Sequence, residues 1–354
     1  MSKTKVTIRD IARIAGVSRG TVDRVLNNRG RVDREKKAKI LRIAEELGYQ
    51  KNMIARNLAL NRKHRINVIL PDSTADQYWE MVYQGILSNE STLQQFNIEV
   101  AFFTFDIQSA EDYLQQLQLA CREAPDFILM APVFQSETLH FFREAPPEST
   151  KFFAINSEVE HPLIETFVGQ DSFQAGTIAG RLFRASIHRG RGKILCITLG
   201  HDNQNAIHIQ KKVEGLEAYQ RSQQRRFDLV PLTIEAFSDP DQIAAHCSRI
   251  EAAHPEIAGI LFTNSRARPF IEKSRYFRAL APPIVTIGFD LTDDNIALLQ
   301  KGQIDYLLNE RPYEQGAQSI HHIFQHLIHD APNPAHHYLP IDIVIKENCG
   351  AYGR

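Results

Sequence analysis

The chain has 354 residues, of which 43% are apolar and 23% charged, with a formal net charge of −1. This length favours two or three domains over one, and no apolar run approaches the roughly 20 residues that a membrane helix needs. The charge is uneven, because the first 65 residues hold 18 Lys or Arg against 6 Asp or Glu, whereas the remainder holds 23 against 36. A basic segment on an acidic body is typical of a nucleic-acid-binding module joined to a domain that controls it.

The cysteines and the N-terminus indicate the compartment. The four cysteines have no CxxC spacing, so we expect mostly buried, reduced thiols rather than disulfides or a metal site. They are Cys121, Cys196, Cys247 and Cys349. No apolar signal region precedes the basic segment, so we expect a cytoplasmic protein with no membrane partner. No cofactor is predicted.

The basic segment begins with two predicted helices. Thr7 and Asp10 are spaced as in a capping box, at the start of an apolar-periodic run. Gly16 and Val17 form a turn, and Ser18 can cap the second helix. The predicted apolar positions are Ile8, Ile11, Ala12, Ile14 and Ala15 in the first helix and Val22, Val25 and Leu26 in the second.

A third helix is predicted over residues 33–47, and Gly48 ends it. Its predicted apolar positions are Ala38, Leu41, Ile43, Ala44 and Leu47. Helix, short turn, helix and a supporting helix form a helix-turn-helix, whose second helix places its first residues on base edges in the major groove. A solvated basic bundle without nucleic acid is the alternative.

The second helix carries the candidate base readers. Arg19, Gly20, Asp23 and Arg24 face outward in the predicted helix. An Arg can donate two hydrogen bonds to guanine, and Gly20 allows close approach of the backbone to DNA. Asp23 either pairs with Arg19 one turn earlier or accepts a hydrogen bond from cytosine.

These motifs resemble the N-terminal headpiece of the LacI/GalR repressor family. The matching segments are Thr7-Ile8, Asp10-Ile11-Ala12, Ala15-Gly16-Val17-Ser18, Thr21-Val22, Arg24-Val25-Leu26-Asn27 and Leu47-Gly48-Tyr49. The resemblance implies that Arg19 and Gly20 read bases and that Arg24 contacts DNA. The further headpiece positions that we expect at the DNA are Thr7, Ser18, Thr21, Asp23 and Asn27.

Residues 51–65 are predicted to form a hinge between the headpiece (residues 1–50) and the body. Ala55 and Leu58 lie on one face of a short helix, and basic side chains surround it. A helix this short is marginal in water, so it could fold only on DNA. In the resembled family two such helices enter the minor groove, and a Leu wedges between base steps. The resemblance implies DNA contacts by Asn52, Ala55 and Leu58, and a plain linker is the alternative.

From residue 66 onward, strand-like and helical segments alternate. Strands are predicted over residues 66–70, 98–103, 126–130, 151–155, 193–197, 229–234, 257–262 and 284–287. Amphipathic helices are predicted over residues 78–95, 110–123, 175–188, 207–221 and 241–254. Near-continuous apolar strands separated by helices predict parallel sheets covered on both faces, with ligands at the carboxyl ends of the strands.

Polar and aromatic side chains follow these strands. Acids and amides can bind adjacent hydroxyl groups, and aromatic rings pack on C–H faces, which suits a sugar or related polyol. The body resembles the type I periplasmic sugar-binding fold of the LacI/GalR family. The matching segments are Tyr78-Trp79, Gly169-Gln170-Asp171, Gly288-Phe289-Asp290, residues 311–316 and Lys346-Glu347-Asn348. Taken singly, each such residue is more often a turn former or helix cap.

The resemblance extends to ligand residues and subdomains. In that family a Gln is usual where Glu310 stands, and an Arg is usual near Lys212. The ligand-binding residues that we predict are Asp72, Tyr78, Trp79, Asp171, Lys212, Asn264, Asp290 and Glu310. We expect one subdomain over residues 66–163 and 294–324, and a second over 164–293 and 325–354. The three crossovers would then fall near residues 160–166, 290–296 and 320–328.

The predicted fold is α/β, with a small all-α helix-turn-helix headpiece followed by two doubly wound parallel-sheet subdomains. We expect a homodimeric regulator of transcription, a repressor, that binds a roughly palindromic operator and is controlled by a sugar-like effector. The alternative is a sugar- or nucleotide-modifying enzyme, for which His201-Asp202 is the candidate acid/base pair. The chain contains no GxxxxGK[ST], GxSxG or HExxH motif, and no metal site is predicted.

Overall fold

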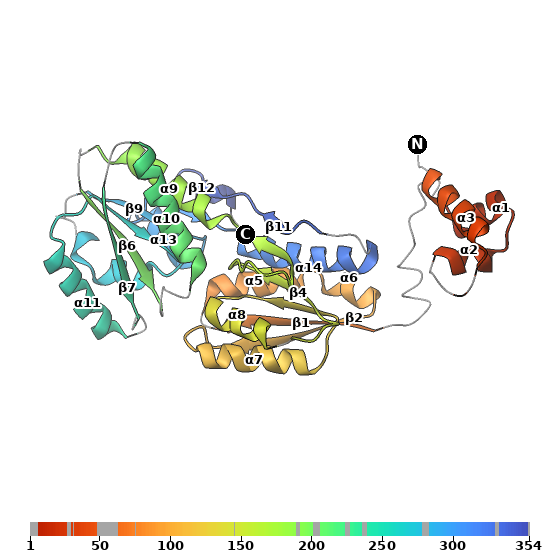
Figure 1. The fold of residues 1–354 in the computed structure, drawn as a ribbon. Helices are drawn as coiled ribbons and strands as arrows, with labels where there is room; N and C mark the ends of the chain where they lie inside the picture. The colour runs from red at the N-terminus through yellow and green to blue at the C-terminus, as the bar shows by residue number, and fades with distance from the viewer. Residues whose placement is uncertain are drawn as a thin grey trace. The chain divides into compact units, whose positions relative to one another are not determined.

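A computed structural model gives the fold of the chain in two compact units, a helical headpiece and a body that begins at Lys63 (Figure 1). The structure describes residues 6–26, 30, 32–47, 63–74, 76–144, 146–188, 192–200, 206–223, 227–235, 239–277, 283–329 and 333–352. Within these residues, no helix is long and apolar enough to cross a membrane.

The described residues of the headpiece form α1 (Ile8–Ala15), α2 (Arg19–Leu26) and α3 (Arg34–Glu46). The capping box is confirmed, because the Asp10 carboxylate accepts hydrogen bonds from the Thr7 N–H (3.0 Å) and O–H (2.7 Å). Gly16 ends α1 with a φ of 70°, a left-handed conformation that glycine adopts without strain. The Thr21 N–H donates to Ser18 Oγ at 3.2 Å, so the predicted cap of α2 is also confirmed.

The headpiece core corrects two details of the prediction. Ile40 is fully buried with Ile43 and Ala44, whereas Leu41 is 45% exposed and Ala38 is exposed. Ile14 is 49% exposed, although its spacing fits the apolar face of α1. In the three described helices, a narrow stripe of each helix is enough to enclose the core, and the apolar residues beside that stripe remain at the surface.

The body contains two six-stranded sheets with the same strand order. The first sheet runs β2 (Ile98–Phe105), β1 (His64–Pro71), β3 (Phe127–Met130), β4 (Lys151–Ile155), β5 (Ile164–Gly169) and β11 (His336–Tyr338). The second runs β7 (Asp228–Ile234), β6 (Lys193–Leu199), β8 (Gly259–Phe262), β9 (Val285–Phe289), β10 (Tyr306–Asn309) and β12 (Asp342–Val344). Only β10 and β12 pair antiparallel among the described strands.

Helices cover both faces of the sheets, as the near-continuous apolar strands predict. Those of the first subdomain are α5 (Gln77–Leu87), α6 (Glu90–Gln95), α7 (Ala110–Arg122), α8 (Gln135–Arg143) and α14 (Pro312–His329). Those of the second are α9 (Ser172–Ser186), α10 (Ile207–Ser222), α11 (Pro240–Ala253), α12 (Arg268–Lys273) and α13 (Asp293–Gln300). One face of the second sheet packs on α9 and α10, and the other packs on α11, α12 and α13.

The strand pairing corrects the predicted subdomain ranges. β5 and β11 belong to the first sheet and β10 to the second, so the crossovers lie at residues 169–172, 309–312 and 338–342. The predicted ranges give each of these strands to the other subdomain. Their sequences could not have decided this, because β5, β10 and β11 are short and an apolar pattern does not identify the partner strand.

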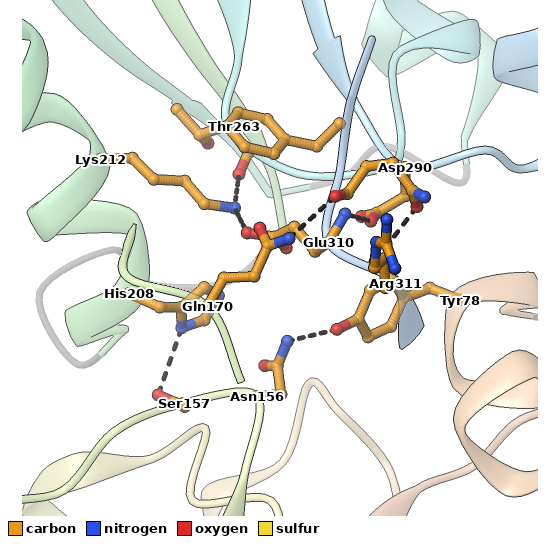
Figure 2. Close-up of polar contacts among 12 residues, drawn as sticks. Tyr78, Asn156, Ser157, Gln170, His208, Lys212, Thr263, Asp290, Glu310 and Arg311 are labelled. Carbon is orange, nitrogen blue, oxygen red and sulfur yellow. Dashed lines mark hydrogen bonds and ion pairs between the residues drawn. The ribbon is translucent and has the colours of Figure 1, made fainter. Parts of the chain in front are cut away.

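One side chain joins all three crossovers. The buried Gln170 side chain, on the first crossover, donates from Nε2 to the carbonyl oxygens of Asn309 (2.8 Å) and Pro340 (2.9 Å). Arg311 of the second crossover donates two hydrogen bonds to the carboxylate of Asp342, at 2.9 and 2.8 Å. The three connections are therefore bonded to one another at one place. Figure 2 shows Gln170 and Arg311, which make these bonds.

Two pairs of helices approach at glycines. A Cβ on Gly176 of α9 would lie 1.8 Å from the Lys212 carbonyl oxygen, and one on Gly215 of α10 would lie 1.9 Å from the Phe173 carbonyl oxygen. In the first subdomain, Gly85 of α5 and Gly316 of α14 form the equivalent contact, at 2.0 and 2.2 Å. Neither contact has room for a side chain, so the two glycine pairs fix the positions of α10 and α5.

Candidate functional site

A cavity of about 100 Å³ lies between the two subdomains, at the carboxyl ends of their strands. This is the position that parallel sheets favour for ligands. The predicted ligand residues that line it are Tyr78, Trp79, Lys212, Asn264, Asp290 and Glu310. Figure 2 shows how side chains from distant segments converge there.

The first subdomain supplies the aromatic wall. Asp76 caps α5 by accepting a hydrogen bond from the Tyr78 N–H at 3.0 Å, which places the two aromatic residues at the start of the helix. Their rings meet edge to face, with centroids 5.1 Å apart. Asn156, at the end of β4, donates from Nδ2 to the Tyr78 hydroxyl at 2.6 Å. The Trp79 ring and the Asn156 amide therefore both hold the Tyr78 ring in place.

Lys212 of α10 is the buried cation of the second subdomain. Its side chain is 1% exposed, and Nζ lies 2.9 Å from Glu310 Oε1 and 3.1 Å from the Thr263 carbonyl oxygen. Nζ also lies 3.7 Å from the centroid of the Phe289 ring. A carboxylate, a carbonyl oxygen and an aromatic face therefore all stabilise the positive charge of this ammonium group.

Asp290 lies at the end of β9, beside Glu310. Its Oδ1 accepts a hydrogen bond from the Glu310 N–H at 3.0 Å. Burial, followed by the neighbouring Glu310 carboxylate, raises the pKa of Asp290 well above its usual value. The site therefore resists carrying two carboxylate charges beside one ammonium group.

Strained backbone marks the strand ends at this site. Asn156, Asp290 and Arg311 have φ values of 68°, 65° and 55°, which non-glycine residues adopt at a cost of about 1 kcal/mol or more each. Asn295 supports the bend at Asp290 by donating to the carbonyl oxygens of Phe289 (2.7 Å) and Asp290 (3.3 Å). Such strain is typical of positions where side chains are held in place for a ligand.

His208 of α10 also lines the cavity, with Nδ1 3.3 Å from the Ser157 hydroxyl. Burial, followed by the charge of Lys212, lowers the pKa of His208 to about 3. The imidazole is therefore neutral near pH 7 and contributes no charge to the cavity.

The mouth of the cavity is bridged by polar contacts between the subdomains. Arg266 forms an ion pair with Asp76. Beside it, Gln77 donates to Asp293 Oδ2 (2.9 Å), and the Asp293 N–H donates to Gln77 Oε1 (2.7 Å). On the other side, Lys211 pairs with Glu158 at 2.7 Å. Polar contacts thus bridge the two subdomains on both sides of the cavity.

Two predicted ligand residues lie away from the cavity. Asp72 accepts a hydrogen bond from the Thr74 N–H at 2.9 Å, which lowers the pKa of its carboxyl, and Asp171 caps α9 by accepting from the Gln174 N–H at 2.9 Å. Both serve as the turn former and helix cap that polar residues after strands often are.

Sequence reasoning missed several residues of the cavity. The most informative are Asp76, His208, Thr263 and Arg266. Arg266 could have been found from its place two residues after Asn264, on the loop that follows a predicted strand. Asp76 carried the same signal, because it lies on the loop after the first predicted strand. His208 gave no such signal, because its position depends on how the subdomains face each other.

In the headpiece, Arg19, Gly20 and Arg24 are exposed on α2, and Thr21 and Asp23 are half-buried there. Arg24 Nε donates to the Gly20 carbonyl oxygen at 3.2 Å, which lays the guanidinium along the helix surface. Thr7 and Ser18 stand at the starts of α1 and α2. Asn27, Asn52, Ala55, Leu58 and the pair His201-Asp202 lie outside the described residues.

No group of three or more His, Cys, Asp or Glu with metal-binding geometry occurs among the described residues. Cys121, Cys196 and Cys247 are buried free thiols, as predicted, and Cys349 is partly exposed. Burial raises the pKa of Cys121 and Cys196 to about 12, which keeps both thiols protonated and unreactive.

Two protein-family models match the chain. Residues 7–52 match the bacterial regulatory proteins of the lacI family, and residues 66–331 match the periplasmic binding protein domain. The body and the headpiece thus each match a family, and the two matches cover most of the chain.

Individual relatives match in part. The transcriptional regulator RegA of Clostridium saccharobutylicum is 33% identical over 138 residues, which cover 39% of this chain and 40% of RegA. The sucrose operon repressor of Klebsiella pneumoniae is 46% identical over 77 residues, or 21% of this chain and 23% of that protein. The chain thus spans less than half the length of these two relatives.

Solved structures match over more of the chain. A LacI transcriptional regulator structure from Bacteroides fragilis matches with a TM-score of 0.73 and 23% identity, covering 82% of this chain and all of that one. At this identity the likeness supports the fold, two parallel-sheet subdomains, and not the ligand.

Proposed function

The chain belongs to the lacI family of bacterial regulatory proteins, with a periplasmic-binding-protein domain as its body, and from this premise we propose that it is a DNA-binding regulator of transcription controlled by a small polar ligand. The ligand is a sugar or sugar derivative, and it binds in the cavity between the subdomains. The observation that carries this proposal is the convergence of Asp290, Asn264 and Tyr78 on one cavity at the strand ends.

The headpiece is proposed to read a roughly palindromic operator as part of a homodimer. Exposed Arg19 and Arg24 on α2 suit contact with guanine, and a two-fold dimer would place two copies of α2 on two half-sites. The basic composition of residues 1–65 supports phosphate contact, while the acidic remainder would be repelled by DNA. Specific binding would therefore depend on the headpiece.

We infer that ligand binding favours one arrangement of the subdomains and so changes how the two hinge segments of a dimer pair. A ligand can shift this equilibrium only by its difference in affinity for the two arrangements. We propose that the protein represses transcription and that ligand releases it from DNA. The names of the relatives, among them a sucrose operon repressor, support regulation and lend nothing to the enzyme alternative.

The test combines operator selection with ligand screening. Purified full-length protein is used to select binding sites from random DNA, and fluorescence anisotropy then measures affinity for the selected site with each candidate sugar. We expect a palindromic site and at least one sugar that weakens binding about tenfold, equivalent to about 1.4 kcal/mol. Enrichment of no sequence would contradict the proposed DNA reading, and tighter binding with sugar would reverse the proposed direction of control.

A further inference from the structure

Acidic groups outnumber basic groups at the floor of the cavity, the part lined by Lys212, Asp290 and Glu310. Three ionisable side chains with little exposure meet there: Lys212 (1%), Asp290 (2%) and Glu310 (6%). His208 is neutral near pH 7, and at the mouth Arg266 and Asp76 neutralise each other. One cation therefore faces two carboxyl groups in a space with little water.

The Lys212 ammonium group already has three partners in the protein. An ammonium group has three N–H bonds, and Lys212 meets Glu310 Oε1, the Thr263 carbonyl oxygen and the Phe289 ring. A carboxylate or phosphate on a ligand would need to displace Glu310 from Lys212, leaving a buried carboxylate unpaired. Such unpaired burial is strongly unfavourable.

Two amide groups near the floor each have one N–H engaged. Asn264 Nδ2 donates to the Leu199 carbonyl oxygen at 2.9 Å, and Asn156 Nδ2 donates to the Tyr78 hydroxyl at 2.6 Å. By contrast, among the described residues no hydrogen-bond donor reaches Asp290 Oδ2 or Glu310 Oε2. The floor thus presents two carboxyl oxygens, Asp290 Oδ2 and Glu310 Oε2, as acceptors for a ligand.

We propose that this pocket selects a ligand with a primary ammonium group, an amino sugar or an amino polyol, whose nitrogen is held by Asp290 and Glu310. This inference rests on the proposed function and narrows its ligand class. An ammonium group brings three donors, no acceptor and the missing positive charge, whereas a hydroxyl group brings one donor and lone pairs that face the carboxylates. The rings of Tyr78 and Trp79 provide faces for the C–H groups of the same ligand.

The pKa of Asp290 agrees with this assignment. Burial and the Glu310 carboxylate raise this pKa well above its usual value, which is the direction expected where carboxyl groups outnumber cations. An ammonium group beside Asp290 would lower the pKa again, so binding of an amine would favour the ionised carboxylate. A neutral sugar would bring no charge that lowers it.

The test uses four ligands that share one ring and differ in charge. Isothermal titration calorimetry of the full-length protein compares D-glucosamine, N-acetyl-D-glucosamine, D-glucose and D-glucuronate, and then the corresponding galactose and mannose series. In the series that binds, we expect the amine to bind at least about tenfold more tightly than its neutral or acidic counterparts. Titrations in two buffers of different ionisation enthalpy should show more proton release for the amine than for its neutral counterpart.

The outcomes separate this inference from the proposed function. Equal or tighter binding of a neutral or acidic member would overturn the ammonium assignment and leave the sugar-responsive regulator intact. Binding by no member of the three series would overturn the sugar ligand and the ammonium assignment together, while operator binding by the headpiece would still be measurable.

Two isosteric variants test the residues. Asp290→Asn keeps an oxygen for the Glu310 N–H, and we expect it to lower amine affinity at least about tenfold. Glu310→Gln would free Lys212, and we expect it to lose the amine preference and gain binding of D-glucuronate. Asp241→Asn, at an exposed carboxylate of α11, is the matched control and should bind like the original chain. Thermal melting without ligand verifies folding, and retention of the amine preference in both variants would overturn the assignment.

Discussion

Asp76 and Arg266 form an ion pair across the mouth of the cavity, and they belong to different subdomains. Both side chains are largely buried, with exposures of 14% and 20%, so water screens the pair less than it would at the surface. The reciprocal hydrogen bonds between Gln77 and Asp293 lie beside it. These contacts stabilise this arrangement of the two subdomains around the cavity.

The first prediction concerns this pair. Arg266→Gln should favour the open arrangement and weaken ligand binding by about 1–2 kcal/mol, mainly through faster dissociation. A double-mutant cycle with Asp76→Asn, measured by calorimetry, should give a coupling energy of at least about 0.5 kcal/mol. Strictly additive effects would show that the two side chains do not act together. Arg268→Gln, which removes an exposed guanidinium from α12, is the matched control.

The second prediction concerns base reading. Arg19→Ala should remove the preference for the selected operator over random DNA, because α2 loses a donor pair for base edges. Residual binding should remain and depend strongly on salt. Anisotropy titrations at several salt concentrations measure both quantities. Arg42→Ala, on the exposed face of α3, should reduce affinity for both DNAs equally. If Arg19→Ala gave the same uniform loss, Arg19 would be a phosphate contact only.

The third prediction concerns the contact between α9 and α10. Gly215→Ala would place a methyl group 1.9 Å from the Phe173 carbonyl oxygen, so the helices must separate. We expect a loss of about 2 kcal/mol or more in the free energy of unfolding, together with weaker ligand binding, because α10 carries Lys212. Urea denaturation and calorimetry measure the two effects. Gly350→Ala, where no atom lies within 4 Å, should change neither.

The fourth prediction concerns pH. Since the pKa of His208 is about 3 in the folded chain and about 6.5 when unfolded, only the unfolded chain takes up a proton between these values. The contribution of His208 to the free energy of unfolding is therefore fully present above pH 6.5 and is lost as the pH falls. A fully buried group would lose at most roughly 1.4 kcal/mol of unfolding free energy per pH unit. His208 is half-buried beside the cavity, so we expect a smaller loss, about 1 kcal/mol between pH 6.5 and 5.

His208→Gln should remove that part of the pH dependence, as measured by urea denaturation at pH 7.5 and pH 5. His188→Gln, at an exposed histidine, should retain it. An unchanged difference between the two pH values in His208→Gln would show that this imidazole accepts a proton in the folded chain.

The sequence was most informative where local chemistry decides the structure. The Thr7–Asp10 capping box, the Ser18 cap and the buried strands of both sheets follow from spacing and apolar periodicity, and each is present. Asp290 and Glu310 were also found, since residues after parallel strands gather at one edge.

What the sequence could not supply depends on contacts between distant segments. No pattern assigns β5 or β10 to a sheet, so the crossovers were misplaced. Lys212 was predicted as a ligand contact, yet its pairing with Glu310 appears only when α10 and the end of β10 are brought together. Charge balance at the cavity floor is likewise a property of the folded arrangement and of no single segment.

The bonds from Gln170 to Asn309 and Pro340 restrict how the body can move. Sliding one subdomain along the other would break both bonds, whereas rotation about an axis through this amide preserves them. The two bonds therefore favour rotation of the subdomains about this point over sliding. Ligands of different shape would all rotate the subdomains about the same point and differ in how far they shift the equilibrium. DNA binding would accordingly depend on the fraction of molecules in the rotated arrangement. It would not depend on which ligand produced that rotation.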